Sequence, residues 1–251
     1  SVSFATATTS CNCVAFRLDD VQDWWMNKES MSVMSVFQNK SIPLTIGIIS
    51  NYFGQDPSIT GYVQSALETD WPLNVAFHGY NHEDFSQLSY DQQYTLIVEG
   101  TEEIDATLGV IPTVFIPPYN AFNNDTLEAL EANGYTTISS ELALDPPPYP
   151  TSGNPPIWRW PEGAQTAELD SEYQGVTWNV TFAEIQAQLK AFGFSVVMMH
   201  PQEYSVNYDT NQVNQAQLDQ LQTLLEAVEE AGIQMVLLMD LQDYFPTSFV
   251  F

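Results

Sequence analysis

The sequence has very few basic residues. It contains five Lys and Arg against 32 Asp and Glu, which gives a net charge of −27. A surface this acidic repels the phosphates of nucleic acids and of anionic membranes, so we expect neither as a partner. The same charge would attract a cationic polymer. The simpler explanation for the excess of acidic residues is solubility in an acidic extracellular setting.

Long hydrophobic runs are also missing. The longest are "QMVLLM" (234–239) and "FSVVMM" (194–199), whereas a membrane-spanning helix needs about 20 apolar residues. We therefore expect no membrane span and predict that both runs are buried strands. Hydrophobic residues make up 44% and aromatic residues 13% of the chain, and this composition argues against disorder.

Cysteine is scarce, and the two cysteines lie close together. Cys11 and Cys13 are separated by a single residue, so they can form a small strained ring or stay free. Three sequons, at Asn39, Asn124 and Asn179, are typical of a secreted eukaryotic glycoprotein. The first ten residues are small and polar, as expected after removal of a signal peptide. We expect a secreted protein, extracellular or in the cell wall.

The order of apolar and amphipathic segments predicts one α/β domain. The length of 251 residues suits a single domain, which we take as 1–251 with 1–12 as an N-terminal extension, and we expect a monomer. Short apolar runs alternate with helical segments, which is typical of βαβ units and a parallel sheet. We predict a closed or nearly closed (β/α) barrel of about seven parallel strands, with a doubly wound open sheet as the alternative. The predicted strands are 14–18, 44–50, 73–78, 113–116, 135–140, 195–200 and 234–239.

Helical spacing is clearest near the C-terminus, where apolar residues of 215–231 share one face. We predict further helices at 181–192, at 124–133 and at about 90–107. The region 141–180 is rich in Pro, Gly and Trp and interrupts the alternation of strands and helices. It is expected to be a long loop or a small β excursion.

Histidine is scarce too, and all three histidines lie at or just past predicted strand ends. His78 and His200 each end a strand, and His82 follows one short loop after His78. Catalytic groups of parallel α/β folds gather at the carboxyl ends of the strands. The first predicted strand ends there in Asp19 and Asp20. The sequence therefore predicts that these five side chains form one site.

One Asp with two His is a ligand set for a divalent metal such as zinc that leaves positions open, as catalytic sites do. The HxxxH spacing of His78 and His82 is weak evidence alone, but the Asp pair and the third histidine strengthen it. Cys11 and Cys13 are a rival ligand set. They precede the first strand, however, and so belong at the opposite end of the barrel.

Two adjacent aspartates can divide the chemical work. If one binds the metal, the other can take the proton of an attacking water, provided that a turn brings both side chains to the same side. His200 could then protonate a leaving group. These groups suit the hydrolysis of an amide or an ester.

Four motifs resemble those of the polysaccharide deacetylase family, carbohydrate esterase family four. They are "FRLDD", "HGYNH", "FIPPYN" and "VVMMH", and the resemblance spans roughly residues 13 to 240. It implies a divergent fungal, chitin-deacetylase-like catalytic domain with a distorted (β/α) barrel. It also implies a metal-dependent deacetylase of acetylated polysaccharides or oligosaccharides. We expect N-deacetylation of chitin or chito-oligosaccharides and zinc as the metal, with cobalt or manganese as alternatives.

The resemblance also implies a role for each motif residue. Asp19 matches the catalytic base, and His200 matches the general acid. The backbone N–H of Tyr119 matches the donor that helps to hold the oxyanion. Met198 falls where the family has a leucine that lines the pocket for the acetyl methyl group. The residues that match the metal ligands are Asp20, His78 and His82.

The chain departs from the family pattern near "FIPPYN". The family has an arginine that pairs with the catalytic Asp at the position of Ile116, and a glycine at that of Asn120. Our hypothesis is that Arg159, in "WRWP", supplies the missing positive charge beside Asp19. The alternative is a surface arginine stacked on tryptophan.

Aromatic and amide side chains near these motifs are candidates for binding the sugar. They are Trp24, Trp160 and Asn120. A core position for the tryptophans and a turn position for Asn120 are the alternatives. Glu203, just after His200, is expected to be solvated.

The sequence leaves the activity open at three points. The chain could be an O-acetyl (xylan) esterase, because N- and O-acetyl groups leave through the same geometry. It could also be an inactive member that binds metal and carbohydrate, or a metal hydrolase that acts on a non-acetyl amide.

Overall fold

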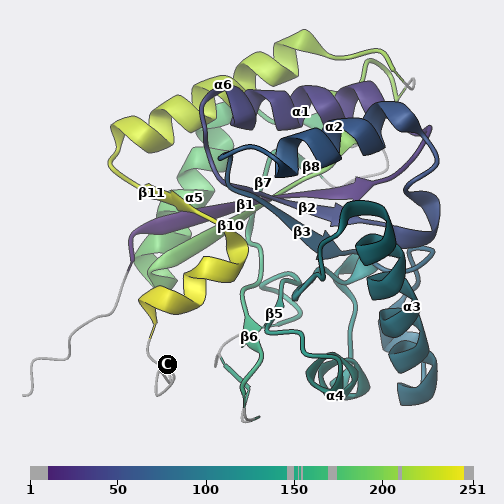
Figure 1. Cartoon of the computed structure of the whole chain (residues 1–251). Coiled ribbons are helices and arrows are strands. Elements are labelled where there is room, and N and C mark those ends of the chain that lie inside the picture. Colours follow the sequence, from purple (N-terminus) through teal and green to yellow (C-terminus); the bar gives the residue numbers. More distant parts are fainter. Residues whose placement is uncertain are drawn as a thin grey trace, which may run out of the picture.

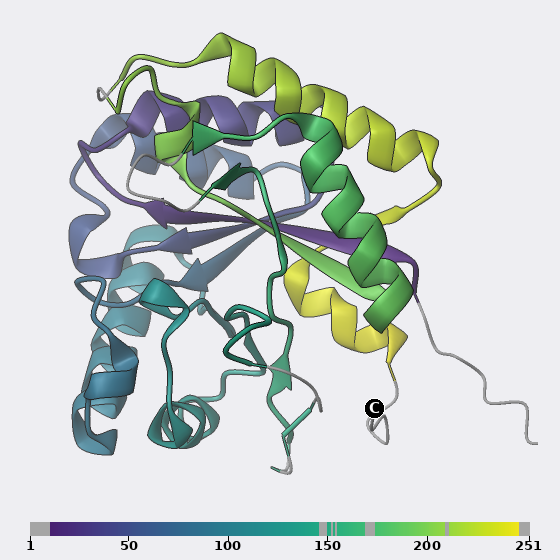
Figure 2. The same ribbon diagram turned by 180° about the vertical axis from the view of Figure 1, so that it is seen from behind.

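The computed structural model describes residues 11–145, 150–151, 153, 155–168, 174–208 and 211–245. Its parallel strands form a sheet that curls into a half-barrel, and helices surround its outer side (Figures 1 and 2). The predicted distorted (β/α) barrel is confirmed. Most of the predicted N-terminal extension, residues 1–10, lies outside the described residues.

Strand β1 (Cys13–Val21) lies in the middle of the sheet, between β10 (Phe194–Met199) and β2 (Leu44–Ile48). All pairings within this sheet are parallel. The remaining strands are β3 (Leu73–Phe77), β4 (Val114–Phe115), β5 (Thr137–Ile138), β6 (Trp158–Arg159), β7 (Ala164–Gln165) and β11 (Gln234–Val236).

Each of the seven predicted strands is present. The described sheet has nine strands, because the segment predicted as a loop or β excursion contributes β6 and β7. That segment also holds a small antiparallel pair, β8 (Ala167–Glu168) and β9 (Gln174–Gly175).

Helices α1 and α2 lie with α6 over one face of the sheet, and α5 lies beside β10 (Figure 1). None of the helices in the described part of the chain is long and apolar enough to cross a membrane. The α-helices are α1 (Asn27–Asn39), α2 (Pro57–Leu67), α3 (Tyr90–Leu108), α4 (Asn124–Ala132), α5 (Trp178–Phe192) and α6 (Gln215–Glu230). Short 3₁₀ helices are η1 (Ser50–Tyr52), η2 (Phe85–Gln87), η3 (Pro118–Asn120), η4 (Pro201–Tyr204) and η5 (Leu238–Tyr244).

The two faces of β1 serve different parts of the interior. Phe16 and Leu18 belong to the large apolar cluster that also includes helix residues. Cys13 and Ala15, which alternate with them, belong to a second cluster that contains Trp158 of β6. Arg17 is fully buried and continues the alternation of this second set. A buried charged side chain therefore shares this face of β1 with apolar residues at the centre of the sheet.

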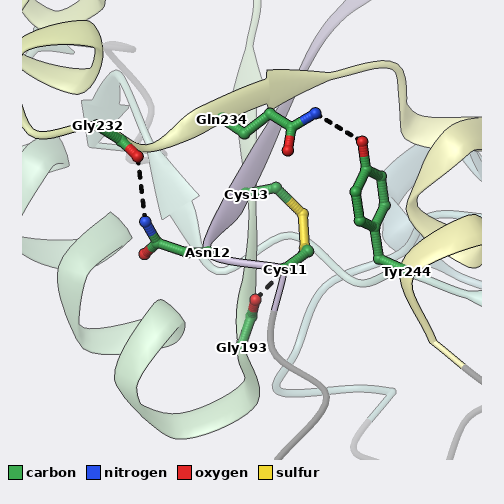
Figure 3. Close-up of a disulfide and its surroundings, with 7 residues drawn as sticks. All are labelled: Cys11, Asn12, Cys13, Gly193, Gly232, Gln234 and Tyr244. Atoms are coloured by element: carbon green, nitrogen blue, oxygen red, sulfur yellow. Dashed lines mark hydrogen bonds between the residues drawn. A yellow bond between two sulfur atoms is a disulfide. The ribbon is translucent and has the colours of Figure 1, made fainter.

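Cys11 and Cys13 form a disulfide at the start of β1 (Figure 3), with their Cα atoms 5.1 Å apart. This resolves the alternatives that the sequence left open. The bond lies beside β11, since the backbone N–H of Gln234 donates to the carbonyl of Asn12 at 3.0 Å. Because Asp19 and Asp20 lie at the other end of β1, and because disulfide sulfurs are not thiolates, these cysteines are no rival metal site.

The packing of α3 on β3 depends on Gly100. A Cβ atom there would lie 2.2 Å from Cε2 of Phe77, so Gly100→Ala should lower the free energy of unfolding by about 1–3 kcal/mol. Gly61 of α2 is the matched control, because an added Cβ would meet no other part of the molecule within 4 Å. Gly61→Ala should stabilise the protein by up to about 1 kcal/mol. Urea denaturation measures both changes, and equal stability of the two variants would contradict this packing.

Candidate active site

Asp19 and Asp20 are both buried at the carboxyl end of β1. The register between β1 and β2 shifts between Leu18 and Val21, and Asp20 has a left-handed backbone with φ of 61°. In a regular strand the two carboxylates would point to opposite faces. This irregularity allows both carboxylates to line the same cavity. It is the turn that is needed if one aspartate binds a metal and the other acts as a base.

The three predicted metal ligands lie together. Oδ1 of Asp20 is 3.2 Å from Nε2 of His78 and 3.2 Å from Nε2 of His82, and the ligand atoms of all three lie within 4.8 Å of one another. His78 follows β3, and His82 comes from the next loop. That loop needs Gly79, whose φ is 78°, because a Cβ there would lie 2.8 Å from Cγ of Pro118.

Neighbouring groups prepare these ligands for a metal. Nδ1 of His78 is 2.8 Å from the carbonyl oxygen of Ile116, so Nδ1–H donates and the lone pair of Nε2 is left for an ion. Burial raises the pKa of Asp20, but the neighbouring imidazoles of His78 and His82 outweigh this effect and hold the pKa well below its usual range. Gln202 donates to the other oxygen of Asp20 at 3.1 Å. An anionic carboxylate with two imidazoles fits a divalent metal.

Asp19 is held on one oxygen only. Nη2 of Arg17 lies 3.2 Å from Oδ2 of Asp19, and Nε2 of His200 lies 3.9 Å from the same oxygen. Oδ1 of Asp19 is buried and has no hydrogen-bond partner among the described residues. A buried carboxylate oxygen of this kind, beside the predicted metal ligands, is suited to accept a proton.

Arg17 also joins segments that are distant in sequence. It donates to the carbonyl oxygen of Ser139 and, at 2.9 Å, to the Ser139 hydroxyl after β5. It donates to Oδ1 of Asn120 in η3 at 2.7 Å. Sequence analysis missed Arg17, although residues two apart on a strand share a face and Arg17 precedes Asp19 by two.

Arg159 does not have the predicted role. Its Nη1 pairs with Oδ1 of Asp145 at 2.7 Å, and the guanidinium that contacts Asp19 is that of Arg17. β6 carries Arg159 several strands away from β1 in the sheet order. The charge missing at Ile116 is therefore supplied from β1 itself.

The predicted oxyanion segment forms a strained turn. Tyr119 and Asn120 have φ of 58° and 54°, a left-handed conformation that non-glycine residues seldom adopt. The Ser140 hydroxyl donates to the carbonyl of Asn120, and the ring of Tyr119 lies edge-on to His82. The amide oxygen of Asn120 binds Arg17. Asn120 thus holds the turn and also lines the catalytic cavity, so its contact with substrate stays a prediction.

The cavity has a volume of about 280 Å³. Met198, predicted to line the acetyl pocket, is buried and lies in its wall. Burial lowers the pKa of His200, and the nearby charges of Asp19 and Asp20 counteract this only in part. The lining residues are Asp19, Asp20, His78, His82, Pro117, Tyr119, Asn120, Glu141, Met198 and His200. Glu141 is the one of these that lies outside the four motifs.

Glu203 is buried, so the expectation of a solvated side chain is wrong. It accepts hydrogen bonds from the backbone N–H of His200 and from the hydroxyl of Thr166. Burial raises the pKa of Glu203 to about 8. This residue fixes the backbone that carries His200.

The two candidate tryptophans differ. Trp160 is only 1% exposed and packs against Trp158, with ring centroids 5.2 Å apart, so the prediction that it contacts substrate is wrong. It belongs to the second apolar cluster together with Trp158 of β6. Trp24 is 64% exposed and lines a separate cavity.

Comparison with known proteins supports the family resemblance of the motifs. The family model described as polysaccharide deacetylase matches residues 6–138 of this chain. No curated protein sequence matches it.

Solved structures share the fold at low sequence identity. An acetyl xylan esterase of family 4 from Clostridium thermocellum, in complex with cobalt, has a TM-score of 0.62 at 13% identity, covering 92% of this chain and 90% of its own. A peptidoglycan N-acetylglucosamine deacetylase has a TM-score of 0.62 at 17% identity, covering 94% and 89%. A CE4 family pseudoenzyme from Bacillus anthracis has a TM-score of 0.64 at 15% sequence identity. The match covers 93% of this chain but 66% of that one, so this chain spans less than two thirds of the pseudoenzyme.

Metal binding should depend on the two histidines and not on Asp19. We expect His78→Ala and His82→Ala to lose a divalent metal, because each removes one of three ligands. Asp19→Asn should retain it, since Asp19 lies outside the cluster of ligand atoms. Metal content after dialysis against zinc tests this, with circular dichroism to check folding. Stoichiometric zinc in both histidine variants would refute the ligand set.

Proposed function

The chain belongs to the polysaccharide deacetylase family, and from this we propose that it is a metal-dependent hydrolase that removes acetyl groups from an acetylated polysaccharide or oligosaccharide. One observation carries the proposal. Oδ1 of Asp19 is buried and has no hydrogen-bond partner within the described residues, while Arg17 pairs with Oδ2, directly beside the cluster of Asp20, His78 and His82. A protein that only bound sugar would not need a carboxylate held in this way.

We propose the following roles for the residues of the cavity. A divalent metal held by Asp20, His78 and His82 would polarise the acetyl carbonyl and acidify the attacking water. Asp19 takes a proton from that water while the oxygen of the water bonds to the carbonyl carbon. The backbone N–H of Tyr119 donates to the oxyanion of the tetrahedral intermediate. His200 gives a proton to the departing nitrogen as its bond to the carbonyl carbon breaks, and acetate is released.

The cavity has an apolar side chain in its wall that suits an acetyl methyl group. Met198 lines the cavity and is almost fully buried, and its sulfur lies 2.9 Å from Nη2 of Arg17. A flexible apolar side chain in this position can pack on the acetyl methyl group. Met198 would thus confer a preference for a small acyl group.

We infer an N-acetylated, chitin-like substrate. Hydrolysis of an N-acetyl group produces an ammonium, and a chain with a net charge of −27 favours a cationic polymer over a neutral one. An O-acetylated xylan is the second candidate, because one structure of the same fold is an acetyl xylan esterase. Zinc is the expected metal, with cobalt or manganese as alternatives.

We also propose that the protein is secreted. A disulfide forms and persists in oxidising surroundings. The three sequon asparagines, Asn39, Asn124 and Asn179, are all exposed, as glycan attachment requires. The fungal origin remains a prediction.

Acetate release is the direct test of the proposed function. The wild-type protein should release acetate from at least one of chitin oligomers, acetylated xylan and peptidoglycan, with zinc, cobalt or manganese added. Asp19→Asn should bind metal yet lose at least about 100-fold in kcat, because the carboxylate that takes the proton of the attacking water is replaced by a neutral amide. Glycan and metal binding without acetate release on every substrate would instead favour a non-catalytic carbohydrate-binding protein.

The two arginines provide a matched comparison. Arg17→Met should lower kcat by about 10- to 1,000-fold with a smaller effect on KM, since the base loses its orienting partner. Arg17→Lys should recover part of the loss. Arg159→Met should leave turnover within about twofold, because Arg159 pairs with Asp145. Thermal unfolding verifies that each variant folds. A larger loss in Arg159→Met than in Arg17→Met would reverse our assignment.

A further inference from the structure

A second cavity, of about 250 Å³, opens beside the catalytic one at the same edge of the sheet. Two segments line it, one that follows β1 and one that follows β2, and these strands are neighbours. The catalytic groups Asp19 and Asp20 come just before the first segment. The lining residues are Gln22, Asp23, Trp24, Asn51, Tyr52 and Gln55.

Two aromatic side chains are exposed in this cavity. Trp24 is 64% and Tyr52 46% exposed, whereas large aromatic residues are usually mostly buried. Trp24 also has a left-handed backbone, with φ of 55°, which is strained for a bulky residue. The segments are joined by a hydrogen bond from the backbone N–H of Asp23 to the carbonyl of Tyr52 at 2.7 Å. The chain thus holds an indole at the surface in spite of its conformational cost.

The cavity also contains a polar group that lacks a partner. Asp23 is only 8% exposed, and its Oδ2 accepts the backbone N–H of Gln55 at 2.6 Å. Its Oδ1 has no hydrogen-bond partner within the described part of the chain. A buried oxygen of this kind is costly unless a donor satisfies it. Aromatic faces together with a few polar groups suit a sugar ring, which has an apolar C–H face and hydroxyl donors.

The wall of this cavity is tied to the metal-ligand loop. Asn51 donates to the side chain of Asn81 at 2.7 Å, and Asn81 directly precedes His82. The backbone N–H of Asn51 donates to the carbonyl of Tyr80, and that of Ser50 to the carbonyl of Gly79. A polymer with one sugar unit in the catalytic cavity would therefore pass beside the second cavity.

We propose that the cavity of Trp24, Tyr52 and Asp23 binds a neighbouring sugar unit of the same polysaccharide chain. The C–H face of this unit stacks on Trp24, and a hydroxyl donates to Oδ1 of Asp23. The inference rests on the proposed function in that it takes the substrate to be a glycan. It adds that affinity depends on the number of sugar units.

Calorimetry with oligosaccharides of one to four units tests this, using metal-loaded Asp19→Asn protein so that turnover does not interfere. Both N-acetylglucosamine oligomers and acetylated xylo-oligomers are used as probes. The tetramer of one series should bind at least about 10-fold more tightly than the monomer. Adding Trp24→Ala should abolish most of this gain, and Asp23→Asn should reduce it.

Tyr94→Ala is the matched control, because Tyr94 is also an exposed aromatic residue but lines neither cavity. It should keep the full gain. A gain that survives Trp24→Ala, equal losses in Trp24→Ala and Tyr94→Ala, or no binding in either series would each overturn the inference. Length-dependent binding through Trp24 in a protein whose wild type releases no acetate would support the inference while refuting the proposed function.

Discussion

The ion pair between Arg17 and Asp19 is the interaction on which the rest of the site depends. Both side chains are buried, and a buried charge is tolerated only where pairing and hydrogen bonds offset its desolvation. The guanidinium meets this need through Asp19, Asn120 and Ser139. The same contacts orient the base, hold the turn that carries Tyr119 and link β1 to the segment after β5. Removal of Arg17 would disturb all of these at once.

Backbone strain is concentrated around the same cavity. Asp20, His82, Tyr119 and Asn120 all have positive φ and all line it, although such conformations are uncommon outside glycine. They persist because surrounding hydrogen bonds hold them, as the Ser140 hydroxyl holds Asn120. Strained residues of this kind tend to gather at functional sites. Here the strain turns consecutive side chains into one cavity.

Much of the fold and of the metal site could be predicted, because both depend on local pattern. Apolar runs defined the strands, and the carboxyl ends of parallel strands must meet at one edge, which brings Asp20 to His78 and His82. The roles of Arg159 and Trp160 could not be predicted, because nearness in sequence to a motif does not say which side chains of the segment around β6 face the site. Arg17 could have been found, since its spacing from Asp19 puts both on one face of β1.

The sequence by itself determined the chemical inventory: one Asp pair, three histidines, and a large excess of acidic residues. It also determined the alternation of strands and helices that brings the motifs to one edge. Only the tertiary structure decided which arginine contacts Asp19, which oxygen of Asp19 that arginine binds, and that Trp24 is exposed while Trp160 is buried. These outcomes depend on contacts between strands that are distant along the chain, and on the local break in β1, which no periodic pattern encodes.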